Sequence, residues 1–297
     1  MQERKLTAID TSLAFFIGFL LSQISVVVVM VIGYIVCIIG GIEIELLQPF
    51  LNTAFGYLLC VIAMDLTMVL VFWFYHKRTD EKFISKPKTK KIFLYILLAI
   101  ISFLALYPIV TCFDSWLVSV GISLNTIPYE LNTANYFISI LSLVILPAIS
   151  EELLFRGIIF KGLKRYGKVF SITISSLMFM IFHLSISQTI YPMMFGLMLG
   201  VIMYYEDNIL YCITAHMTNN FLSLTLSYFN VSLSYNHWSY ILIAVILMLV
   251  FITVILYFTI KNSKKVEKVK PNAKELTFLI GSLIIMLIIW IANNFLS

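Results

Sequence analysis

The stretch ANYFISILSLVILPAISEELLFRGIIFKG, residues 134–162, decides the class of the fold. It begins as an apolar run without charge and then places Glu151, Glu152 and Arg156 inside the same run. A helix of roughly 20 apolar residues crosses a membrane, and a charge inside it is costly unless it is paired or hydrated. The stretch therefore predicts a transmembrane helix whose three charges have a structural or chemical purpose.

The rest of the chain has the composition of a polytopic membrane protein. Of its 297 residues, 61% are hydrophobic and 12% are charged, and the mean hydropathy is +1.00. We expect an all-α fold, a polytopic membrane helical bundle of about nine transmembrane helices, with eight as the alternative count. The expected spans are 12–39, 52–75, 92–112, 134–160, 169–187, 190–205, 208–229, 239–260 and 276–296. The first span is expected to stay as a helix and not to be a cleaved signal peptide.

The basic residues set the expected orientation. All but one of the 20 lysines and arginines precede the first span or fall in residues 76–91, 161–168 and 261–274. The positive-inside rule then places the N-terminus in the cytoplasm of a multi-pass cell-membrane protein. These loops are expected to contact membrane lipids, so the net charge of +5 does not indicate a nucleic-acid partner. A chain rich in Ile, Lys and Asn is typical of a low-GC bacterium.

Helical spacing separates the charges of the fourth span. Glu152 and Arg156 are four residues apart, which favours an ion pair on one face. Glu151 lies on a different face without such a partner, which makes it the candidate general base. Pro147 predicts a kink or a widened turn before it. Asp65, in the second span, is expected to be a hydrogen-bonded structural acid, with a second polar site as the alternative.

Polar side chains of two further spans reach a similar depth. Measured along straight helices from the basic ends, Glu151 lies ~15 Å deep, His183 ~21 Å, His216 ~12 Å and Asn220 ~18 Å. His216 and Asn220 are also four residues apart, hence on one face. We therefore expect one shared, water-accessible site nearer the cytoplasmic side. Asn219 is expected to face elsewhere.

Two chemistries fit these groups. Glu151 and His183 can hold and deprotonate a water, while His216 and Asn220 donate hydrogen bonds to the oxyanion that forms on an attacked carbonyl. Alternatively, Glu151, His183 and His216 can ligate a divalent metal such as zinc that activates the water. The spacing does not match HExxH, so the sequence leaves the metal open and makes no cofactor certain. Both chemistries lead to peptide hydrolysis within the membrane.

Three motifs carry a family resemblance. They are Glu151-Glu152-x-x-x-Arg156, Phe179-x-x-x-His183 and His216-x-x-x-Asn220. Together they resemble the motifs of the CPBP intramembrane proteases, which group the type II CAAX prenyl endopeptidases with bacteriocin-processing and immunity (Abi) proteins. The resemblance implies Glu151 as the catalytic acid/base and His183 as its partner on the water. It implies His216 and Asn220 as oxyanion stabilisers or metal ligands, with Glu152 and Arg156 as supporting residues.

These observations give one functional expectation and a rival. We expect accessory helices in 1–133, a catalytic core in 134–230 and further accessory helices in 231–297. The expected activity is that of an intramembrane endopeptidase of glutamate or metallo type, acting near the cytoplasmic half of the membrane. Its substrate is expected to be a hydrophobic, lipidated or membrane-associated peptide or protein. Examples are a CAAX-type tail and a pheromone or bacteriocin precursor. A role in immunity is a further possibility for the same activity. The rival is a non-proteolytic scaffold or a proton-coupled transporter that uses the same buried residues.

The short sixth span carries one packing signal. Gly196 and Gly200 form a GxxxG pattern, which predicts a close approach to a neighbouring helix.

Overall fold

The computed structural model describes residues 4–124, 126–231, 242, 245, 246, 249 and 269–295. The regular elements within these ranges are helical, which confirms the all-α class. The long helices are α1 (Ala8–Gly40), α3 (Ala54–His76), α4 (Thr89–Ser119), α8 (Lys168–Phe182), α9 (Ile190–Glu206), α10 (Ile209–Tyr228) and α12 (Ala273–Phe295). Two short turns, η1 (Ile44–Leu46) and α2 (Leu47–Leu51), connect α1 to α3.

The fourth expected span is one helical segment, Thr133–Lys164, built from five pieces. These are α5 (Thr133–Ser139), the π-helical turn η2 (Ile140–Ile145), α6 (Leu146–Glu152), the π-helical turn η3 (Leu153–Ile159) and α7 (Phe160–Lys164). We call this segment the central helix. π-Helical turns are rare and often lie at functional sites, and here two of them flank the pair Glu151–Glu152.

Most expected spans correspond to described helices. Among the described residues, five segments are long and apolar enough to cross a membrane, namely α1, α3, α4, the central helix and α12. Helices α8 and α9 are apolar but shorter, and α10 has 20 residues. The predicted break between the fifth and sixth spans lies at residues 183–189. The expected span 239–260 falls outside the described residues, apart from positions 242, 245, 246 and 249.

Pro147 shapes the central helix just before the two acids. Proline has no N–H, so it cannot donate to the carbonyl of Leu143 four residues earlier. The side chain of Asn220, from α10, supplies that donor instead, with Nδ2 3.1 Å from the Leu143 oxygen. The turn that contains Leu143 is the π-helical turn η2, which is the widening that the sequence predicts. A side chain that satisfies a freed backbone group is a common solution in membrane helices.

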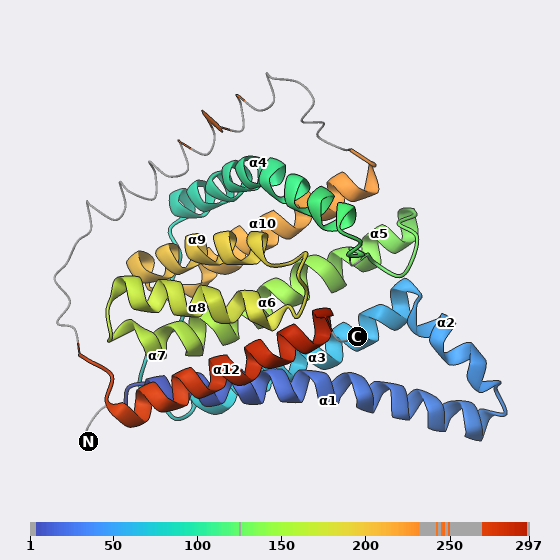
Figure 1. Cartoon of the computed structure of the whole chain (residues 1–297), viewed down its shortest axis with the longest axis horizontal. Coiled ribbons are helices and arrows are strands. Elements are labelled where there is room, and N and C mark those ends of the chain that lie inside the picture. The colour runs from blue at the N-terminus through green and yellow to red at the C-terminus, as the bar shows by residue number, and fades with distance from the viewer. Residues whose placement is uncertain are drawn as a thin grey trace.

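The central helix runs between two groups of helices (Figure 1). Helices α1 and α3 pack on one side of it, and α12 lies along α1. Helix α10 packs on the other side and in turn carries α4 and α9. Helix α8 follows the central helix through a short turn and lies against α9. The accessory helices expected at both ends of the sequence therefore contact the helices that carry the three motifs.

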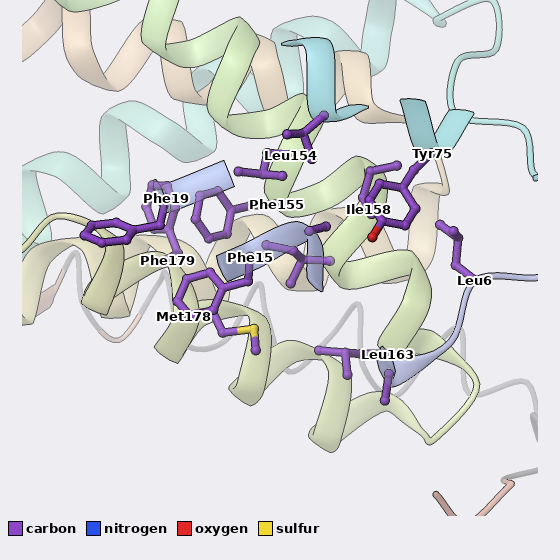
Figure 2. Close-up of a cluster of buried hydrophobic side chains, with 14 of the residues drawn as sticks. Leu6, Phe15, Phe19, Tyr75, Leu154, Phe155, Ile158, Leu163, Met178 and Phe179 are labelled. Carbon is purple, nitrogen blue, oxygen red and sulfur yellow. The ribbon is translucent and has the colours of Figure 1, made fainter. Parts of the chain in front are cut away.

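Two clusters of buried apolar side chains hold these groups together. The first joins α1, α3, the central helix, α8 and α12, and Figure 2 shows its centre. Phe155 lies at this centre, with edge-on contacts to Phe15 at 6.4 Å and to Phe179 at 5.0 Å between ring centroids. The second cluster joins α4, α7, α8, α9 and α10, and includes Leu199 and Cys212, which are fully buried. Packing of this kind holds helices together where lipid is as apolar as the side chains.

The glycines of α9 allow the close approach that the sequence predicts. A Cβ added to Gly196 would lie 3.2 Å from the Cβ of Ser176, and one added to Gly200 would lie 3.2 Å from Cγ2 of Ile172. Both neighbours belong to α8. The GxxxG expectation is therefore confirmed, and the contact brings the Gly196 carbonyl to the central helix.

Charged loops meet at one end of the bundle, which we call the basic end. Lys161 is buried there; its Nζ lies 2.7 Å from the Lys82 carbonyl oxygen and 2.9 Å from Asp207 Oδ1. Lys164 also donates to Asp207 at 2.9 Å. Asn208 caps the start of α10 with its side-chain oxygen, and its Nδ2 donates to the carbonyl oxygen of Ser85. Burial alone would raise the pKa of Asp207, but the hydrogen bonds from the two lysines outweigh it and hold this pKa below its usual range.

Candidate functional site

The two adjacent acids of the central helix lie in different environments. The side chain of Glu152 is completely buried, whereas that of Glu151 is 16% exposed and lines a cavity. This separation follows from the ~100° rotation between neighbouring residues of a helix. Glu151 is thus placed where a bound molecule can reach it, and Glu152 is not.

Glu152 forms the ion pair that the spacing predicts. Arg156 Nη1 donates to Glu152 Oε1 at 3.0 Å, and neither side chain is exposed. Arg156 also donates from Nη2 to the carbonyl of Gly196 at 3.3 Å, and its guanidinium carbon lies 4.6 Å from the centre of the Phe179 ring. A buried charge is tolerated when it is paired and hydrogen-bonded in this way. The pair ties the central helix to α8 and α9.

The same carboxylate also holds a histidine of α10. Nδ1 of His216 lies 2.9 Å from Glu152 Oε1. A carboxylate only accepts, so Nδ1 carries the proton and Nε2 forms the free edge of the ring. That edge faces Glu151, whose Oε2 is 3.9 Å from Nε2. The distance is too long for a direct hydrogen bond. Glu152 therefore orients the imidazole toward the second acid, a link that sequence spacing does not show.

His183 is oriented by its own helix end. It is the C-cap residue of α8, and its Nδ1 lies 2.8 Å from the carbonyl oxygen of Phe179. A carbonyl cannot donate, so in the neutral ring Nδ1 bears the proton and Nε2 keeps a lone pair. The next residue, Leu184, has a positive φ of 52°. The side chain of Asn294, from α12, stabilises this turn by donating to the Leu184 carbonyl and accepting from the backbone N–H of Ile186.

Asn220 lies one turn beyond His216 on the same face of α10. One of its two amide N–H groups is used on the Leu143 carbonyl, so the other remains available for a ligand. Asn219 donates to Asn220 at 3.3 Å and accepts from the hydroxyl of Tyr191 on α9. Asn219 does not line the cavity, which agrees with the expectation that it faces elsewhere.

A cavity of about 1030 Å³ brings the predicted residues together. Its lining includes Glu151 from the central helix, His183 from the end of α8, and His216 and Asn220 from α10. These residues are far apart in sequence and come from three helices. Glu152 and Arg156 lie behind this wall and do not line it.

The structure adds Asp65 to the cavity. Helix α3 contributes Tyr57, Val61, Met64, Asp65 and Met68 to the lining. Asp65 is hydrogen-bonded, as the sequence predicts for a structural acid, because Ser150 Oγ donates to its Oδ1 at 2.7 Å. Its Oδ2 and Oε2 of Glu151 are both buried and have no hydrogen-bond partner among the described residues. In the sequence, Asp65 stands out as a lone acid in an apolar span. Only the packing of α3 against α6 places this acid beside Glu151.

The described lining residues show which way the cavity extends from Glu151, a point on which the sequence makes no prediction. Glu151 lies closer along the central helix to Lys164 than to Thr133, so its level agrees with a site nearer the basic end. The cavity, however, extends the other way. Its lining includes Thr126, Ile127, Tyr129, Leu131 and Asn230, and no residue of 76–91 or 161–168. Toward the basic end, buried side chains of η3 and α7 fill the space.

The suggested metal ligands do not form a metal-binding group. Within the described ranges, no three His, Cys, Asp or Glu side chains are arranged so that they could hold a metal ion. Zinc requires its nitrogen and oxygen ligands at ~2.0–2.2 Å from one shared point. Glu151, His183 and His216 do not meet this requirement as placed.

Comparison with known proteins supports the motif assignment. Residues 133–222 match the family model described as Type II CAAX prenyl endopeptidase Rce1-like. The matched segment contains the central helix, α8, α9 and the part of α10 that carries His216 and Asn220. No curated protein and no solved structure shows a significant match to the chain.

Proposed function

Because residues 133–222 belong to the type II CAAX endopeptidase family of CPBP intramembrane proteases, we propose that this chain is an intramembrane endopeptidase with Glu151 as its catalytic acid/base. The observation that carries this proposal is the shared cavity, where Glu151, His183, His216 and Asn220 meet from three helices. Charged and amide side chains at membrane depth are expensive, so their convergence on one cavity indicates a reaction site more than a packing device.

Water activation is assigned to Glu151 and His183. The carboxylate of Glu151 takes a proton from the water, and the lone pair on Nε2 of His183 accepts the water's other hydrogen bond. The water oxygen then attacks the carbonyl carbon of the substrate peptide. Collapse of the tetrahedral intermediate breaks the C–N bond, and Glu151 returns its proton to the leaving amine nitrogen.

Oxyanion stabilisation is assigned to His216 and Asn220. The second amide N–H of Asn220 is a neutral donor. His216 can donate from Nε2 only as an imidazolium, because its Nδ1 proton is already used on Glu152. Donors held in a low-dielectric cavity stabilise a developing charge more strongly than water does.

Glu152 and Arg156 are assigned a positioning role. They do not reach the cavity, but Glu152 fixes the ring of His216 and Arg156 fixes Glu152. The substrate is proposed to be a hydrophobic, lipidated or membrane-associated peptide or protein. A CAAX-type tail, a pheromone or bacteriocin precursor and a protein tied to an immunity role are its candidate classes.

The test compares purified wild type with Glu151→Gln in liposomes. Both are incubated with a library of hydrophobic and lipidated peptides, with and without a chelator, and products are read by mass spectrometry. Asp114→Asn is the matched control, since Asp114 is an acid within α4 that does not line the cavity. We expect cleavage by wild type and by the control but not by Glu151→Gln, with no effect of the chelator.

The other outcomes redirect the assignment. Cleavage that is lost in chelator and restored by zinc would favour the metal alternative. Equal cleavage by wild type and Glu151→Gln would refute the role of Glu151. If no peptide is cleaved and a membrane partner is processed normally in cells carrying Glu151→Gln, the scaffold is the better description.

A further inference from the structure

We propose that the substrate reaches this site from the membrane face opposite to the basic end, as an extended peptide with neutral or basic side chains beside the bond that is cut. The inference rests on the proposed function and adds the side of access and the charge preference.

Hydrogen bonds show that the basic segments share one end of the molecule. The backbone N–H of Val269, just before α12, donates to the carbonyl of Arg165, just after α7. Arg4 donates from its backbone to Asp80 Oδ2 at 3.1 Å. With the contacts of Lys161, these bonds bring together the segments before α1, after α3, after the central helix and before α12. By the positive-inside rule this end faces the cytoplasm.

The opposite end carries acids and lacks basic residues in its described part. The connections there are residues 41–53, 120–124, 126–132 and 229–231, and their charged residues are Glu43, Glu45 and Glu130. The segment 126–131 is held in place by Tyr129, whose hydroxyl bonds to Ser139 at 2.9 Å and whose ring lies 5.7 Å from that of Tyr57. A negatively charged face attracts basic segments, is indifferent to neutral ones and repels acidic ones.

The lining of the cavity leads from the catalytic level to this opposite end. Along α10 it includes His216, Asn220, Ser223 and Ser227, which recur every three or four residues. The eleven residue steps from His216 to Ser227 correspond to ~16 Å of helix. A second hollow of about 410 Å³ shares Ser223, Ser227 and Asn230 and extends to Phe103 and Tyr107 of α4. The two hollows therefore adjoin at this end of α10, beside α4, and we call their shared residues the mouth.

The path toward the basic end is filled. Phe155, Ile158, Ile159 and Leu163 are completely buried in the cluster that joins the central helix to α1, α3 and α8. Figure 2 shows Phe155, Ile158 and Leu163 within this packing. Interiors of this density have few voids larger than a water molecule. A peptide presented from the basic end would have to displace this core to reach Glu151.

The cavity also selects for charge. Asp65 and Glu151 are its only ionisable acids among the described lining residues, and no Lys or Arg accompanies them. Asp65 is 6% exposed and its Oδ2 has no partner in the described part of the chain. An acidic substrate side chain would add a third carboxyl group to a low-dielectric site that already holds two, whereas a lysine or arginine would find the unpaired Oδ2 of Asp65.

Thiol labelling tests the side of access without requiring a substrate. In a chain without its four native cysteines, Ser227→Cys marks the mouth and Lys164→Cys marks the basic end. A charged, membrane-impermeant thiol reagent is applied to intact cells and then to permeabilised cells. We expect Ser227→Cys to be labelled in intact cells and Lys164→Cys only after permeabilisation. Labelling of Ser227→Cys only after permeabilisation, or in neither case, would overturn the proposal.

Cleavage by the purified protein tests access and charge preference together. A bulky thiol reagent on Ser227→Cys should abolish cleavage of library peptides, and the same reagent on Lys164→Cys should not. A peptide with lysine beside the cut bond should be hydrolysed faster than its glutamate counterpart, and the reverse order would refute the charge preference. If no peptide is cleaved by any variant while the labelling pattern is as expected, the proposed function fails and the side of access stands.

Discussion

Removing either partner of the ion pair between Glu152 and Arg156 should destabilise the protein strongly, whereas removing both should cost less. The two side chains are fully buried and 3.0 Å apart. At an effective dielectric constant of about 20, charges at this distance attract by roughly 5 kcal/mol. Removing one partner from a buried pair costs ~3–5 kcal/mol, because the other charge is left uncompensated. Glu152→Gln keeps the shape and an acceptor for His216, so it removes mainly the charge.

The assay is thermal unfolding of purified variants in one detergent. At roughly 2–4 °C per kcal/mol, Glu152→Gln and Arg156→Met should each lower the midpoint by on the order of 10 °C. The double variant should be more stable than either single one, since it leaves no unpaired charge. Lys164→Gln is the control, because it removes a more exposed pair worth ~0–1 kcal/mol. A double variant whose loss equals the sum of the single losses would refute the coupling.

Three further predictions concern packing, hydrogen bonding and pH. Gly196→Ala should lower the free energy of unfolding by ~1–3 kcal/mol, because the added methyl group overpacks against α8. Gly281→Ala, where an added Cβ meets nothing within 4 Å, should be neutral or slightly stabilising. Equal unfolding midpoints for the two variants would contradict the close approach of α9 to α8. Asp65→Asn should preserve stability because it still accepts from Ser150, and Asp65→Leu should lose ~1–3 kcal/mol; equal losses in the unfolding midpoint would count against this bond. The folded pKa of Asp207 lies below its unfolded value of ~3.9. The stabilisation by the Asp207 carboxylate is therefore fully present above that value and is lost as pH falls through the folded pKa. Asp207→Asn should lower the unfolding midpoint at pH ~5–8, and the difference from wild type should vanish under strongly acidic conditions. A difference in midpoint that grows on acidification would show the sign to be wrong.

Much of the fold follows from the order and spacing of residues along the chain. Long apolar runs such as that of the central helix must become helices in lipid, because every backbone N–H and C=O has to be satisfied within the segment. Spacing also sufficed for the pair of Glu152 and Arg156, which lie on one face of one helix. The family motifs selected Glu151, His183, His216 and Asn220, and these residues do line one cavity.

Sequence spacing fails where a contact joins different helices. The bond from Glu152 to His216 and the position of Asp65 beside Glu151 depend on how α10 and α3 pack against the central helix. The sequence treated Glu152 as half of an ion pair and Asp65 as a separate structural acid. Neither the rotation nor the neighbours of a helix are fixed by its own periodicity when lipid and protein interior are equally apolar.

The sequence by itself determined that this chain is a helical membrane protein, where its helices run, and which residues carry unusual charge for their depth. Only the tertiary structure decided which of those residues face one another and where the cavity opens. The physical reason is that hydrophobicity and hydrogen bonding act locally along each helix, whereas the cavity is what remains between helices after their side chains have packed. Phe155 and Leu163 are buried on the side of the basic end, whereas Ser223 and Ser227 line the cavity on the other side.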